Sequence, residues 1–75
     1  MLYDMNAIME HGIETQDGRL FETFQSVKGY YSAMEVTMFR PDEPEYYRSD
    51  NFDDLMSKII ERHKSYKIVQ QIIIY

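Results

Sequence analysis

The clearest hydrophobic pattern in the chain lies in residues 51–64. Apolar side chains and one histidine recur there at positions i, i+3, i+4, i+7, i+8 and i+11, which places them on one face of an α-helix. They are Phe52, Leu55, Met56, Ile59, Ile60 and His63. Aspartates in the first turn and basic residues in the last turn suit the helix dipole, and Ser49 or Asp50 can cap the N-terminus. The pattern predicts an amphipathic helix ended by Ser65.

A β-hairpin is predicted around Asp17-Gly18. This pair lies between residues 13–15 and 19–24, which carry threonine and aromatic side chains, and glycine accepts the positive φ of a tight turn. The apolar residues of 20–27 also fit helical spacing, so a helix is the alternative there. We favour a strand because Phe, Thr and Val are poor helix formers. Gly29 then allows a second reversal of the chain.

Apolar and polar side chains alternate along residues 32–40 and predict a clearer strand. Met34 and Glu35 therefore point to opposite faces of it. Residues 40–44 contain both prolines and are expected to form a loop, because proline restricts its own φ and the preceding residue. Residues 45–48 follow as a short strand.

The last strand, residues 66–75, carries β-branched side chains on both faces. Such a strand lies either in the centre of a sheet or at a subunit interface. A strand meander, one helix and a final strand predict an α+β fold, an antiparallel sheet with the helix packed on one face. One helix covers one face only, so we expect the other face to form a homodimer. Residues 2–9 fit either a strand or a short helix.

Composition limits the function. With 75 residues, the chain is expected to form a single domain, 1–75, whose small core leaves little room for a deep cleft. It has no cysteine, so neither a disulfide framework nor a thiolate metal site is expected. Met1-Leu2-Tyr3-Asp4 lacks the basic start of a secretory signal, and no apolar run is long enough to span a membrane. We therefore expect a cytoplasmic protein without membrane contact.

Catalytic chemistry has no clear signature in this sequence. The net charge of −5 argues against binding of nucleic acid. His11 is interpreted as a turn residue and His63 as a boundary residue at the helix C-terminus, and the three glycines are too isolated for a phosphate loop. Asp50, Asp53 and Asp54 lack the glycine and terminal glutamate of a calcium loop. We expect a protein that is not an enzyme and holds no metal or cofactor.

Six of the 13 acidic residues fall within residues 42–54, with Arg48 the only basic residue among them. One interpretation is a solvated loop followed by a dipole-matched helix start. The other is a band of carboxylates that occupies a partner's basic groove, built for the phosphates of DNA. In that case the interleaved aromatic side chains supply anchors. The candidate partner-binding residues are Asp42, Glu43, Glu45, Tyr46, Tyr47, Asp50, Phe52, Asp53 and Asp54.

Part of this pattern resembles a known family. The segments Glu35-Val36-Thr37-Met38, Tyr46-Tyr47 and Asp50-Asn51-Phe52-Asp53-Asp54-Leu55, followed by an isoleucine-rich strand, look like the small uracil-DNA glycosylase inhibitors of Bacillus phages. The resemblance implies an acidic dimeric DNA mimic of strand–strand–helix–strand order. In that family a phenylalanine after an aspartate enters the glycosylase pocket, and Phe52 takes the matching position. The alternative for Phe52 is the first residue of the helix's apolar face.

The resemblance covers the second half of the chain. An additional N-terminal segment of about 30 residues and a loop with two prolines depart from the family pattern. Phage proteins that plug the basic channel of the host sliding clamp are similar in type, by size and acidity. We therefore expect a host-takeover inhibitor that mimics DNA charge and blocks a host DNA-binding protein with a basic groove or channel. The alternative is a small acidic structural or regulatory homodimer without DNA mimicry.

Overall fold

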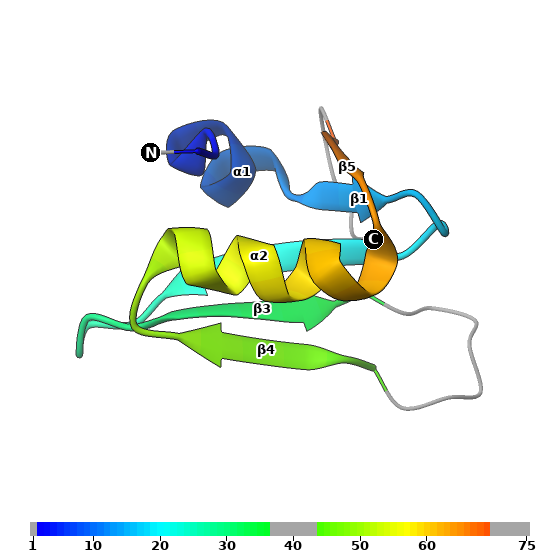
Figure 1. Cartoon of the computed structure of the whole chain (residues 1–75). Coiled ribbons are helices and arrows are strands. Elements are labelled where there is room, and N and C mark those ends of the chain that lie inside the picture. Colours follow the sequence, from blue (N-terminus) through cyan, green and yellow to red (C-terminus); the bar gives the residue numbers. More distant parts are fainter. Residues whose placement is uncertain (1, 37–43, 70–75) are drawn as a thin grey trace.

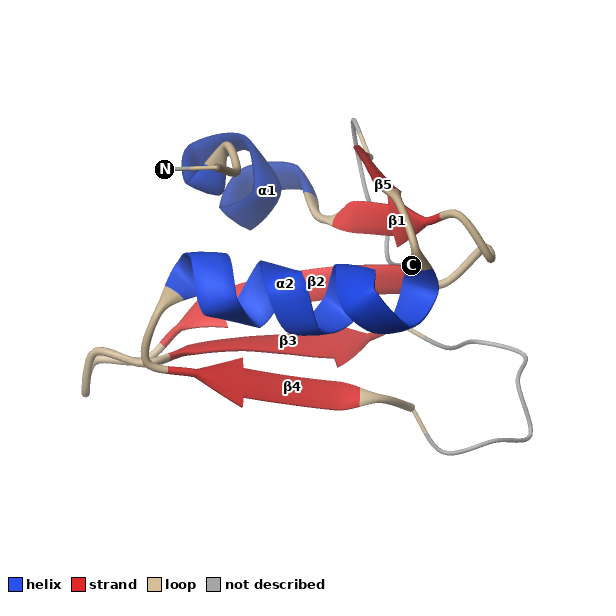
Figure 2. Cartoon of the chain, viewed as in Figure 1, coloured by secondary structure: helices blue, strands red, loops and turns tan. Residues whose placement is uncertain are grey.

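The computed structural model describes residues 2–36 and 44–69 (Figure 1). Five antiparallel strands form one sheet in the order β4-β3-β2-β1-β5, and the helix α2 packs against it (Figure 2). The predicted α+β architecture is confirmed, with one addition, the short helix α1. The elements are α1 (Met5–His11), β1 (Ile13–Thr15), β2 (Leu20–Gln25), β3 (Tyr31–Glu35), β4 (Tyr46–Ser49), α2 (Phe52–His63) and β5 (Tyr66–Ile68).

Two hairpins build the first three strands. β1 pairs antiparallel with β2, and Gly18 takes a φ of 88° in the turn between them. β2 pairs with β3 through five residue pairs, and Gly29 takes a φ of 96° at that reversal. Residues 20–25 are thus a strand, and the helical alternative for this segment is wrong. The hydrophobic spacing that fitted a helix instead places Phe21 on the inner face and Phe24 on the outer one.

The first and last strands of the described chain pair with each other at one edge of the sheet. Ile13 of β1 pairs with Ile68 of β5, so residues 66–68 lie at an edge and not in the centre. The rest of the predicted last strand, residues 70–75, lies outside the described residues, as do 37–43 with most of the proline-containing loop. The short-helix alternative holds for the N-terminal segment. Asp4 begins α1, where its side chain accepts a hydrogen bond from the N–H of Ala7 at 3.2 Å.

The N-terminus of α2 differs from the prediction by one or two residues. Asn51 is the cap, and its side chain accepts a hydrogen bond from the Asp54 N–H at 3.1 Å. Ser49 lies two residues before the cap, where its hydroxyl accepts a hydrogen bond from the Asn51 N–H and donates one to the Asp54 carboxylate. The helix ends at His63, and Lys64 follows with a φ of 74° and donates its N–H to the carbonyl of Ile60.

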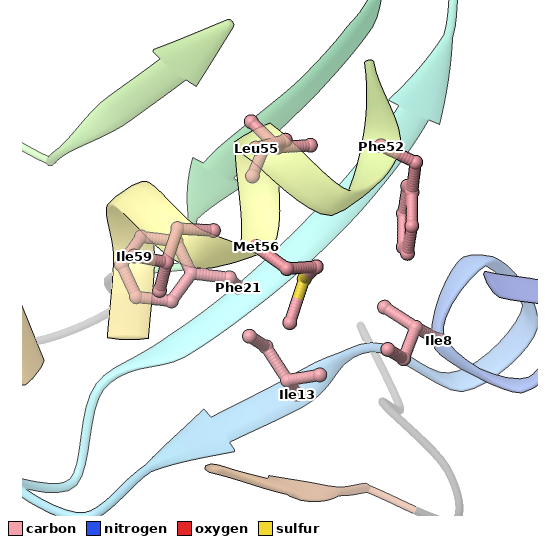
Figure 3. Packing of buried hydrophobic residues seen from close by; sticks show 8 residues of the cluster. Ile8, Ile13, Phe21, Phe52, Leu55, Met56 and Ile59 are labelled. Carbon is pink, nitrogen blue, oxygen red and sulfur yellow. The ribbon is translucent and has the colours of Figure 1, made fainter. Parts of the chain in front are cut away.

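The core lies between the helices and one face of the sheet. In Figure 3, Ile8 of α1 and Met56 of α2 approach Ile13 of β1. Thr23, on the inner face, donates a hydrogen bond to the carbonyl of Ile8, so α1 lies on the same side of the sheet as α2. The fully or almost fully buried hydrophobic residues are Ile8, Ile13, Phe21, Ala33, Phe52, Leu55, Met56 and Ile59.

The predicted alternation along β3 is present, and the structure fixes which face is which. Glu35 lies on the inner face with 4% of its surface exposed, whereas Met34 is 45% exposed on the outer face. A charged residue is therefore buried and an apolar one exposed. The reason lies in the partners that surround Glu35.

Candidate functional site

Charged and polar side chains from five segments meet near the C-terminal end of α2. We call this group the charge cluster. Asp17 and Arg19 come from the β1–β2 turn, and Glu35 from the end of β3. The other members come from the residue before β4, from β4 itself and from the last residue of α2. The charge cluster consists of Asp17, Arg19, Glu35, Glu45, Tyr47 and His63.

His63 is buried in the middle of the charge cluster, with 5% of its surface exposed. Its Nδ1 lies 2.7 Å from the Asp17 carboxylate and its Nε2 lies 3.0 Å from the Glu45 carboxylate. A carboxylate accepts but does not donate, so both contacts are hydrogen bonds only when both ring nitrogens carry a proton. The ring of His63 thus joins the β1–β2 turn to the residue before β4. His63 is more than the boundary residue expected from the sequence.

Arg19 explains how Glu35 is tolerated on the inner face. Its Nη1 lies 2.8 Å from one oxygen of Glu35 and 2.9 Å from one oxygen of Glu45. The side chain of Glu35 is only 1% exposed, and a buried carboxylate needs such compensation. Glu35 also accepts a hydrogen bond from the backbone N–H of Glu45 at 3.3 Å. Arg19 therefore contacts two carboxylates at once and ties the end of β3 to the residue before β4.

Two carboxylates of the cluster, those of Asp17 and Glu45, have a lowered pKa, which favours their charged form. A hydrogen bond from the Thr15 hydroxyl is the main cause that lowers the pKa of Asp17, and His63 and Arg19 add to it. Burial raises the pKa of Glu45, but hydrogen bonds from Tyr47 and His63 and the charge of Arg19 outweigh this and lower it. Burial first, and then the neighbouring Glu45, raises the pKa of Tyr47 to about 12. The cluster is built for ionised acids.

Stability is therefore expected to fall in acid. A lowered folded-state pKa contributes stability above the unfolded-state value of about 4, and this contribution is lost as the pH falls through the lower folded-state values. Urea unfolding followed from about pH 6 to about pH 2.5 should show this loss. Glu45→Gln should flatten the dependence, whereas the exposed Glu61→Gln should leave it unchanged. Equal slopes in both variants would contradict the role of Glu45.

The chemistry open to the cluster is narrow. A surface hollow of about 320 Å³ adjoins it, lined by Gln16, Asp17, Arg62, His63 and Lys64. Both nitrogens of His63 are already occupied by carboxylates, so the ring has no free nitrogen to offer a substrate in this hollow. In residues 2–36 and 44–69, no group of three or more His, Asp or Glu side chains is arranged to hold a metal ion. The geometry therefore gives the charge cluster a structural role, because its contacts hold separate segments of the fold together.

The candidate partner-binding residues that the structure describes are divided between the interior and the surface. Asp42 and Glu43 lie outside the described residues. Glu45 and Tyr47 belong to the charge cluster, and the Glu45 side chain is only 16% exposed, so its charge is compensated inside the molecule. The structure thus separates acids that are close in the sequence, because alternate positions of an extended segment point to opposite faces.

Phe52 belongs to the core. It is 3% exposed and meets the ring of Tyr31 edge to face, with the ring centres 5.6 Å apart. Figure 3 shows its ring directed toward Ile8 of α1. The interpretation of Phe52 as the first residue of the helix's apolar face is confirmed. Its side chain is not displayed as an anchor for a partner.

Three aspartates remain near the surface at the start of α2. Asp50 and Asp54 are exposed, and Asp53 is partly exposed. Asp54 accepts a hydrogen bond from Ser49 at 2.6 Å and lies 3.3 Å from Lys58, and these contacts lower its pKa. Tyr46, 57% exposed, lies at the opposite end of β4 from Asp50. The acids and the exposed aromatic ring are therefore not side by side.

Comparisons with protein-family models, with curated proteins and with solved structures gave no match in any of the three. Neither α1 nor α2, the helices of the described ranges, is long and apolar enough to cross a membrane.

Proposed function

We propose that this chain is a phage-type inhibitor that mimics the charge of DNA and blocks a host DNA-handling protein in the cytoplasm. Uracil-DNA glycosylase is the first candidate target and the replication sliding clamp the second. The observation that carries the proposal is the set of surface aspartates Asp50, Asp53 and Asp54, in a chain of net charge −5. The resemblance to the phage glycosylase inhibitors lends support, since these residues belong to the matching segment.

The carboxylate of Asp54 is held in place at the start of α2. Its side chain accepts a hydrogen bond from Ser49, which also accepts from the N–H of the cap residue Asn51. A carboxylate that keeps a fixed position loses little side-chain freedom when it enters a basic groove, so more of the electrostatic attraction remains as affinity. The groove's field also attracts an acidic protein from a distance, which makes binding sensitive to salt.

The burial of Phe52 changes the expected balance of forces. In the family that this chain resembles, the phenylalanine supplies apolar contact inside the glycosylase pocket, whereas here it stabilises the core. Binding through the aspartates alone would rest mainly on charge. We therefore expect affinity to fall steeply as the salt concentration rises.

Binding to purified uracil-DNA glycosylase and to a purified bacterial sliding clamp tests this proposal, by calorimetry at low and at high salt. The double variant Asp50→Asn/Asp54→Asn should bind about tenfold more weakly, because each exposed ion pair contributes up to about 1 kcal/mol. Glu10→Gln/Glu61→Gln is the matched control, with the same change of net charge on two other exposed acids. It should bind within about twofold of the unchanged protein.

The proposal fails if neither target binds, if binding is independent of salt, or if the two double variants weaken it equally. The charge of Glu45 is compensated inside the molecule by Arg19 and His63, so it is not available to a basic groove. This observation favours the alternative, a small acidic structural or regulatory homodimer. In that case both double variants should leave the association of the chain with itself unchanged, and neither DNA-handling protein should be bound.

A further inference from the structure

The face of the sheet opposite the helices, here called the outer face, exposes several large apolar side chains. Phe24, Met34 and Tyr46 come from three adjacent strands and are 44%, 45% and 57% exposed. α2 lies across the other face in Figure 1, and the Thr23 bond places α1 there as well. In the part of the chain that the structure describes, no helix covers the outer face.

Strand register arranges this face in two neighbouring rows. Glu22 pairs with Met34, and Met34 pairs with Tyr46, which forms one row across β2, β3 and β4. The next row runs from Phe24 on β2 through the almost buried Ser32 on β3 to Arg48 on β4. Glu22 and Arg48 thus occupy diagonally opposite corners, with Phe24 and Tyr46 at the other two corners and Met34 in the middle of the first row.

These two corner charges have no ion-pair partner within residues 2–36 and 44–69. Arg48 lies over the ring of Tyr30, 3.9 Å from its centre, an arrangement that leaves its charge available to a further partner. Glu22 is partly exposed beside Met34. Further along the outer face, Glu14 of β1 and Lys67 of β5 form an ion pair at 3.0 Å, so their charges cancel. With Glu22 and Arg48 the outer face therefore carries two acids and two bases and is neutral, in a chain whose net charge is −5.

We propose that the outer faces of two copies of this chain pack together about a two-fold axis, with Glu22 of each copy against Arg48 of the other. In a two-fold interface a contact from residue i to residue j is repeated from j to i, so diagonally opposite charges of opposite sign complement themselves. Like-charged molecules repel one another least where their surfaces are neutral, which favours this face for self-association. The apolar side chains are then buried away from water at the centre of the interface, and the two ion pairs fix the orientation of the copies.

Charge exchange tests the contact. Glu22→Arg makes both corners basic and Arg48→Glu makes both acidic. In a dimer of either variant, corner residues of like charge would therefore face one another across the two-fold axis and repel. Each should dissociate at least about a hundredfold more readily than the unchanged protein, because facing like charges cost several kcal/mol. Light scattering should show a mass of about 18 kDa, twice 9.1 kDa, for the unchanged protein and a shift toward 9.1 kDa for each variant. Circular dichroism verifies that the variants stay folded.

Combining the two charge reversals makes the test specific. An equimolar mixture of Glu22→Arg and Arg48→Glu should form a mixed dimer, detected by native mass spectrometry, and the double exchange in one chain should restore self-association. Matched controls in and just after α2, Glu61→Arg and Lys64→Glu, carry the same changes of net charge at exposed positions away from the outer face and should leave the dimer intact.

A monomeric unchanged protein, dimers that resist both corner variants, or a mixture without the mixed dimer would each overturn the proposal. This inference does not rest on the proposed inhibitor function. The measurement uses the chain alone, so its failure and the failure of binding to a DNA-handling protein are separate results.

Discussion

Replacing Phe52 with alanine is expected to lower the free energy of unfolding by about 3–5 kcal/mol, the range for an aromatic residue removed from a core. Its ring is almost fully buried between α1, α2 and Tyr31, so alanine would leave a cavity that the backbone cannot close. Domains of this size are only marginally stable, and the variant should be largely unfolded near its normal working temperature. Urea unfolding followed by circular dichroism measures the change.

Val27→Ala is the control, since this side chain in the β2–β3 turn is fully exposed and lies outside the two rows of the outer face. It should change the free energy of unfolding of the monomer by no more than about 0.5 kcal/mol. If Phe52→Ala instead kept its stability and lost only the binding of a glycosylase, the residue would be an anchor for the partner and the assignment to the core would be wrong.

The second large effect is expected for Arg19→Met. Removing one partner of a buried ion pair typically costs about 3–5 kcal/mol, since a charge loses its compensation away from water. Here the cost should be about 2–3 kcal/mol, because Glu45 keeps its contacts with His63 and Arg62. Methionine retains most of the length of the side chain, so the measured loss reports mainly on the charge.

Arg62→Met provides an unusually close comparison. Arg62 also contacts Glu45, with the nitrogen and oxygen 3.6 Å apart, but its side chain is 67% exposed. An exposed pair contributes little, so this variant should lose less than about 0.5 kcal/mol. Chemical denaturation of the two variants at neutral pH tests the difference. Equal losses would mean that burial does not set the importance of Arg19.

The hydrophobic pattern predicted most of the fold because its period differs between the elements. The helix at residues 52–63 and the turns at Gly18 and Gly29 follow from local chemistry, either the spacing of apolar residues or the need for positive φ. The cap at Asn51 was missed by one or two positions, since Ser49, Asp50 and Asn51 all have suitable side chains.

The charge cluster could not be predicted in the same way. Asp17 and His63 are 46 positions apart, and only the assembled sheet brings them together. Two signals were nevertheless present in the sequence. His63 continues the apolar face of the helix, and Glu35 shares its strand face with Ala33. A titratable residue at a position of the buried face calls for a partner of opposite charge, but the sequence does not say which one.

In the acidic segment, by contrast, residues that are close in the sequence lie apart in the fold. Spacing along the chain made six acids look like one band, whereas the described ones divide between an internal role and a surface role. Glu45 turns inward to Arg19 and His63, while Asp50 and Asp54 face solvent. Proximity in sequence predicts a shared surface only where the backbone repeat returns side chains to the same side.

The strand order has a consequence for how the chain can be divided. β4 and β5, the strands of the second half, lie at opposite edges of the sheet, and β1, β2 and β3 from the first half fill the space between them. The segment that resembles the phage inhibitors is thus not a detachable module with an N-terminal extension. Without residues 13–35, the described strands β4 and β5 would lose the neighbours with which they pair, β3 and β1, so a fragment beginning at residue 44 should remain unfolded.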